Sequence, residues 1–106
     1  MSDAAIANFD EVAVALEQLG ARRAKMMGRP MLALERRMFA CLEGDRLALK
    51  LGAGTPEFDE AMAIPGAELF SRGASNRRFT DWVAIPAEHS DRWEEFAVAA
   101  LHRLTA

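Results

Sequence analysis

The sequence predicts an α+β domain in which N-terminal, middle and C-terminal helices pack on a curved antiparallel β-sheet, a meander plus a returning strand. Residues 25–51 hold short apolar runs separated by turn residues, which is typical of a β-meander. A further strand-like run at residues 79–85 follows a helical segment and returns to the sheet. Residues 4–19 and 91–104 repeat apolar residues every three or four positions, the pattern of amphipathic helices.

The first helix is predicted over residues 4–19. Ser2 or Asp3 is placed to cap its start, and Gly20 stands where a C-terminal cap belongs. Its apolar stripe consists of Ile6, Phe9, Val12, Ala13, Leu16 and Leu19. Residues 21–24 then lead into the sheet.

The meander is predicted as three strands, at 31–34, 38–42 and 47–51, with an extra short strand at its entrance left open. Gly44 supplies the positive φ that a tight hairpin loop needs. In the third strand the leucines alternate with Arg46, Ala48 and Lys50, so one face is expected on a core and the other towards water. Pro30 cannot donate to a ladder, which predicts an exposed edge at residues 27–34 and allows a homodimer through that edge.

The second half begins with a helix that Thr55 caps and Pro56 opens, and that Pro65 and Gly66 end. A short strand over 68–70, a polar loop over 71–76 and the strand 79–85 follow. Alternation in that strand places Phe79, Asp81, Val83 and Ile85 on one face and Thr80, Trp82 and Ala84 on the other. Ser90 or Asp91 is expected to cap the last helix, whose stripe is Trp93, Phe96, Ala97, Ala100, Leu101 and Leu104.

Composition indicates a single globular domain, 1–106, with 51% hydrophobic and 27% charged residues. One cysteine excludes an internal disulfide and favours a reducing, cytoplasmic location. No apolar run approaches the ~20 residues of a membrane span, and the acidic start is unlike a signal peptide.

The net charge of −3 is unevenly distributed. Residues 22–50 hold eight basic and three acidic residues, a net +5, so the remainder carries −8. This basic segment is a candidate nucleic-acid surface, with ordinary solvated strand and turn residues as the alternative. The candidate residues are Arg22, Arg23, Lys25, Arg29, Arg36 and Arg37, supported by Arg77 and Arg78.

The order of several short motifs resembles the N-terminal domain of the TfoX (Sxy) family and, more distantly, the MmcQ/YjbR-like proteins. The motifs are Ala21-Arg22-Arg23 running into Met26-Met27-Gly28-Arg29, then Arg37-Met38-Phe39-Ala40, Asp45 to Lys50, and Trp82-Val83-Ala84-Ile85-Pro86. The family usually has an aromatic residue where Met27 stands. The resemblance implies an α+β domain with a curved antiparallel sheet, a regulatory link to DNA uptake, and DNA binding in the related YjbR-like fold. It carries over no catalytic residue, and the longer TfoX proteins have a second helical domain.

No catalytic, metal or cofactor motif emerges from the residues themselves. Cys41 lies mid-strand and is expected to be a buried, inert thiol. His89 and His102 lack the neighbours of a metal site, and the glycines before Thr55 lack P-loop spacing. The carboxylates Glu57, Asp59 and Glu60 are expected to match a helix dipole. Trp82 and Trp93 are expected to be packing anchors.

Four methionines, Met26, Met27, Met31 and Met38, surround the first strands. They predict either adaptable core packing or a pliable partner-binding surface. The sequence therefore favours a non-enzymatic regulatory or binding domain with a nucleic-acid or protein partner and no cofactor. The alternative is a small-molecule-binding protein or a small enzyme of unknown reaction.

Overall fold

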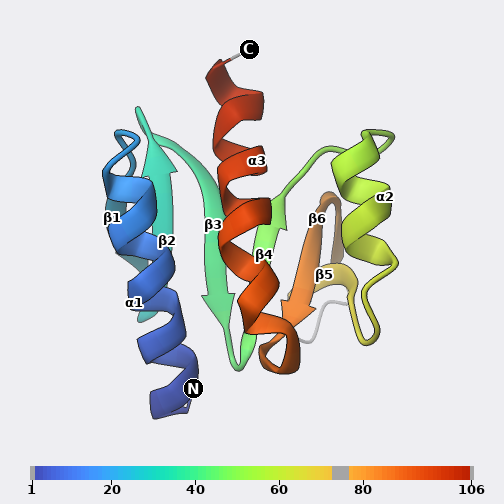
Figure 1. The fold of residues 1–106 in the computed structure, drawn as a ribbon, viewed down its shortest axis with the longest axis horizontal. Coiled ribbons are helices and arrows are strands. Elements are labelled where there is room, and N and C mark those ends of the chain that lie inside the picture. Colours follow the sequence, from blue (N-terminus) through green and yellow to red (C-terminus); the bar gives the residue numbers. More distant parts are fainter. Residues whose placement is uncertain (1, 73–76, 106) are drawn as a thin grey trace.

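The chain forms one six-stranded antiparallel sheet with three α-helices on one of its faces, in a computed structural model that describes residues 2–72 and 77–105 (Figure 1). The predicted α+β class is confirmed. The elements are α1 (Asp3–Glu17), β1 (Arg22–Met26), β2 (Arg29–Leu34), β3 (Arg37–Glu43), β4 (Arg46–Lys50), α2 (Pro56–Met62), β5 (Glu68–Arg72), β6 (Arg77–Pro86), the 3₁₀ helix η2 (Ala87–Arg92) and α3 (Trp93–Thr105).

The strand order is β1-β2-β3-β4-β6-β5, and all neighbouring strands run antiparallel. The first four strands form a meander, whereas β6 inserts between β4 and the edge strand β5. The strand β6 is the returning strand that the sequence predicts, and this prediction is confirmed. Of the polar loop predicted over residues 71–76, residues 71 and 72 end β5 and the rest lie outside the described part of the chain.

The entrance to the meander is a full strand, because β1 pairs with β2 from Arg22 opposite Ala33 to Met26 opposite Arg29. The prediction of an exposed edge at residues 27–34 is therefore wrong, since β1 pairs with that side of β2. The hairpin between them turns at Met27 and Gly28, both with positive φ (52° and 80°), as two-residue turns of the I′ kind require.

The main core lies between the sheet and the helices. α1 packs on β1, α3 packs on β3 and β4, and α2 packs beside β6 (Figure 1). Trp93 of α3 is fully buried there, and its indole Nε1–H donates to the carbonyl oxygen of Ile85 at 3.1 Å. The predicted anchoring role of Trp93 is confirmed. The other large, fully buried side chains are Phe39, Leu16, Leu32, Leu42, Leu47, Leu49, Leu51, Ile85 and Val83.

The first two helices begin at capping residues that the sequence predicts. Ser2 Oγ accepts from the Ala5 N–H and Thr55 Oγ1 accepts from the Phe58 N–H, each at 3.1 Å. Gly20, at φ +99°, ends α1 with the paired hydrogen bonds of a Schellman motif, including Ala21 N–H to Leu16 O.

The start of the last helix differs from the prediction. Ser90 does not cap it, because Ser90 Oγ accepts instead from Asn8 Nδ2–H at 3.2 Å. The 3₁₀ helix η2 occupies residues 87–92, and α3 begins only at Trp93. The predicted stripe is confirmed: its first five members are buried and Leu104 is half-buried. None of the helices in the described ranges has the length and apolar character that crossing a bilayer requires.

Candidate functional site

The face of the sheet opposite the helices carries a second apolar cluster; we call this side the open face. No residue of a described helix belongs to the cluster. Its buried members are Met31, Cys41, Ala48, Phe70 and Ala84, and Met38, Phe79 and Trp82 pack against them. The prediction that Ala48 faces water is wrong, because Ala48 is fully buried in this cluster. Arg46 and Lys50 share its side of β4 and are half-buried.

A row of small side chains crosses the centre of the open face. Cys41 on β3 lies opposite Ala48 on β4, and Ala48 lies opposite Ala84 on β6. On the other side of Cys41 the row ends at a larger side chain, Met31 on β2. Because the central positions are small, larger side chains on the outer strands enclose a hollow above them.

A register shift between β2 and β3 brings Met38 to this hollow. Leu32 lies opposite Ala40, but the next residue, Ala33, lies opposite Met38, so Phe39 is an extra residue in β3. Phe39 and Ala40 both pack in the helix-side core, whereas Met38 and Cys41 both belong to the open-face cluster. In a regular strand, residues three apart would point to opposite faces.

A second shift, between β5 and β6, brings Phe79 to the same hollow. Leu69 lies opposite Val83 while its neighbour Phe70 lies opposite Phe79. The prediction that Phe79 shares a face with Val83 is therefore wrong. Phe79 instead stacks on Phe70 with ring centroids 5.5 Å apart, and Trp82 lies 6.1 Å from Phe70.

Asp81 lies within this irregular stretch of β6 and holds the loop that follows β4. Its carboxylate Oδ1 accepts from the Ala53 N–H at 3.0 Å, and its carbonyl oxygen accepts from the N–H groups of Leu51 and Gly52. The loop that leaves β4 is thereby tied to β6.

The side chains of the open face enclose an apolar pocket of about 150 Å³. An apolar cavity of that volume holds one benzene ring. Three thioethers, one thiol and three aromatic rings supply its walls, together with one arginine. The lining residues are Met26, Arg29, Met31, Met38, Cys41, Phe70, Phe79 and Trp82. Cys41 is 4% exposed, which confirms its predicted burial. Trp82 is a wall of this pocket.

The charges around the pocket differ between its two ends. At one end Arg29 Nε lies 2.5 Å from Glu43 Oε2, and Arg46 Nη1 lies 3.6 Å from Glu68 Oε1. At the other end Lys50 lies directly opposite Trp82 in the β4–β6 ladder. Within the described residues Lys50 forms no ion pair, and Asp81 is engaged with Ala53.

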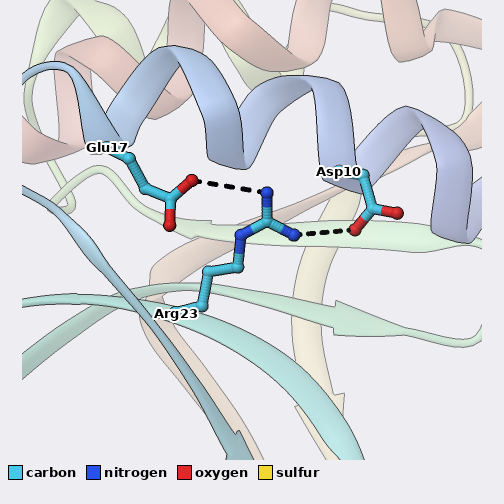
Figure 2. Close-up of polar contacts among 3 residues, drawn as sticks. All are labelled: Asp10, Glu17 and Arg23. Atoms are coloured by element: carbon cyan, nitrogen blue, oxygen red, sulfur yellow. Dashed lines mark hydrogen bonds and ion pairs between the residues drawn. The ribbon is translucent and has the colours of Figure 1, made fainter.

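The predicted nucleic-acid residues divide between the two faces of the sheet. In β1, Arg22 lies opposite Ala33 on the open face, and the neighbouring residue Arg23 points to the helices. Arg23 bridges Asp10 at 3.0 Å and Glu17 at 3.3 Å, both on α1 (Figure 2). Lys25 is on the helix side like Arg23, because it lies two residues further along the strand.

The remaining candidates are also dispersed. Arg37 donates to the carbonyl oxygen of Leu104 at 2.9 Å, and Arg36 occupies the β2–β3 turn with φ +73°. Arg29 belongs to the pocket wall. The side chains of Arg77 and Arg78 lie outside the described part of the structure. Nucleic-acid binding through this set stays a prediction, and the structure does not gather the set on one surface.

Other candidates have structural roles. Glu57 and Asp59 lie in the first turn of α2, as predicted, and Glu60 pairs with Arg92 at 3.3 Å. A hydrogen bond from Arg92 to Glu95 raises the pKa of the Arg92 guanidinium. Among the described residues, no group of three or more His, Cys, Asp or Glu side chains could hold a metal ion. Met26 and Met27 are exposed, at 40% and 83%, whereas Met31 is buried.

Comparisons with models of protein families, with curated proteins and with solved structures found no match to this chain. The pocket was missed at the sequence level because strict alternation separates its members. Its local signals are the methionines around the first strands, since Met26, Met31 and Met38 line it, and the three-residue spacings Met38 to Cys41 and Phe79 to Trp82.

Proposed function

We propose that this chain is a non-enzymatic binding domain whose ligand site is the pocket on the open face. The single observation that carries this proposal is that two separate register shifts turn Met38 and Phe79 towards one hollow. Irregularities of this kind are common where a strand must re-aim a side chain at a functional site.

The chemistry of the walls favours an apolar ligand. The solvent side of an antiparallel sheet usually carries polar residues, whereas this one carries methionine and aromatic side chains. An apolar group that enters leaves water and gains contacts with those walls, at roughly 25 cal/mol for each Å² buried. Methionine suits such a site because its unbranched side chain adapts to the ligand's shape. The volume of about 150 Å³ selects one ring or a short branched chain.

The two tryptophans provide a direct test. Trp82 lines the pocket and Trp93 is fully buried on the other side of the sheet, so their indole N–H resonances report on the two faces separately. We expect titration with toluene to shift the Trp82 resonance in a saturable way and to leave that of Trp93 in place. Cys41→Leu adds volume inside the pocket and should abolish the shift while the protein stays folded. Movement of both resonances together, or of neither, would contradict the proposal.

A regulatory role of the TfoX-like kind belongs to the same proposal. The order of motifs in the chain and its α+β fold support that resemblance, and the lone cysteine supports our proposal of a cytoplasmic location. A protein or nucleic-acid partner is compatible with a domain that also binds a small apolar group. The dispersal of the arginines makes direct DNA binding the less supported mode.

A further inference from the structure

We infer that the pocket takes small apolar carboxylates, acids with one ring or a short branched chain, and that Lys50 receives the carboxylate group. The inference rests on the proposed function and adds the chemical class of the ligand. It comes from the asymmetry of charge around the pocket, which the apolar walls alone do not explain.

The ion pairs at one end leave little net charge to attract an anion. Arg29, although it lines the pocket, lies 2.5 Å from the carboxylate of Glu43, and Arg46 pairs with Glu68. A ligand carboxylate at that end would meet two carboxylates already held by the protein. Like charges in one place repel, so this end of the pocket disfavours an anion.

The other end carries positive charge without an acidic partner in the described residues. Lys50 stands directly opposite Trp82 on the same face of the sheet. Asp81, the acidic residue next to Trp82, accepts a hydrogen bond from Ala53 N–H and makes no ion pair with Lys50. Arg22 lies on the open face as well and adds to the positive potential there.

Lys50 is close enough to act on a group bound in the pocket. Adjacent strands are about 5 Å apart, and Trp82, its cross-strand neighbour, is a wall of the pocket. Lys50 is half-buried, as expected when a lysine stem lies along apolar surface and its ammonium reaches water. A carboxylate one or two bonds from the ring would therefore meet the ammonium at the rim, where a charge-assisted hydrogen bond is stronger than a neutral one.

The chain offers a matched control, because its only two lysines lie on opposite faces of the sheet. Lys50 is on the open face and Lys25 is on the helix side of β1. Phenylacetate and phenylacetamide provide the matched ligands, since they differ mainly in charge. We expect the wild-type chain to bind phenylacetate about fivefold more tightly than phenylacetamide, measured from the Trp82 indole resonance. Lys50→Gln should remove this preference, and Lys25→Gln should keep it.

The outcomes separate the two claims. Equal affinity of the wild-type chain for both ligands would overturn the carboxylate inference and leave the pocket proposal standing. Loss of the preference in Lys25→Gln as well as in Lys50→Gln would also overturn it, because the effect would then come from net charge. If phenylacetate, phenylacetamide and toluene all leave Trp82 unchanged, the proposed function fails and the inference fails with it.

Discussion

The two faces of the sheet are built from the same strands but are packed differently. On the helix side, the central strands β3, β4 and β6 present large aliphatic side chains that are fully buried: Leu42, Leu47, Leu49, Val83 and Ile85. On the open face, the same three strands present Cys41, Ala48 and Ala84. The helix side is filled by α1, α2 and α3, whereas the open face keeps a hollow of about 150 Å³.

This contrast indicates that the two faces of one sheet have different roles. Close packing against helices stabilises the fold, because each large side chain is removed from water and surrounded by protein atoms. Small residues at the centre of the other face give up part of that stabilisation and leave space for a ligand. Three comparisons between the faces test this division of roles, beginning with the largest expected effect, and a fourth test concerns a turn of the sheet.

The two tryptophans should differ most in their contribution to stability. Trp93→Ala removes a fully buried side chain and leaves the Ile85 carbonyl without its indole donor, so we expect a loss of about 3–5 kcal/mol in the free energy of unfolding. Trp82→Ala removes a half-buried wall of the pocket and should cost about 1–2 kcal/mol. Urea denaturation followed by circular dichroism measures both. Equal losses would show that the open face is as much a structural core as the helix side.

Thiol chemistry can compare the faces at adjacent positions. Cys41 lines the pocket, whereas Ala40 is fully buried on the helix side. We expect the small reagent methyl methanethiosulfonate to modify Cys41 in the folded protein. In the double variant Ala40→Cys with Cys41→Ala, modification should occur only when the protein unfolds, at the rate of unfolding, because residue 40 is fully buried in the helix-side core. Mass spectrometry over time gives both rates, and equal rates would contradict an open pocket at Cys41.

The adjacent arginines of β1 give a smaller contrast. Arg23→Gln breaks two exposed ion pairs to α1 and should lower the free energy of unfolding by about 1 kcal/mol at low salt. Arg22→Gln, on the open face, should change it by less than about 0.5 kcal/mol. Added salt should shrink the difference between the variants, because exposed pairs are screened. A difference that persists at 1 M salt would have another cause.

The smallest effect concerns Asp45, in the turn between β3 and β4. A hydrogen bond from the Ser2 N–H to its carboxylate, at 3.0 Å, lowers the pKa of Asp45 below its ordinary value of 3.8. The folded state thus holds the ionised form more tightly, so this contact stabilises fully above pH 3.8 and is lost as the pH falls through the lowered value. Asp45→Asn should therefore flatten the acid side of the stability profile slightly. An unchanged profile below pH 4 would rule out the contact in solution.

Periodicity predicted the elements that bury one continuous stripe. The stripe of α3 could be read from the sequence because every third or fourth residue from Trp93 to Leu101 meets the sheet. The leucines of β4 could be read for the same reason. The burial of Ala48 could not, because alternation separates two faces but does not say what covers each of them.

The site was less predictable than the fold because it depends on departures from regular pairing. Whether Met38 and Phe79 reach the open face is decided by the register with β2 and β5, strands whose alignment the local sequence does not encode. The arginines show the same dependence on register. Arg22 and Arg23 are neighbours in the chain, yet pairing with β2 sends one to the open face and the other to α1. The local sequence therefore did not indicate which face of the sheet each arginine occupies.

The strand order also bears on how the protein is made on the ribosome. The meander β1–β4 is synthesised before its partner strand β6 and before α3, the helix that covers β3 and β4. Until α3 emerges, Leu42, Leu47 and Leu49 have no helix to cover them, and a nascent chain in that state displays the kind of surface that chaperones bind. Native structure should therefore appear in one step, only after α3 has left the exit tunnel.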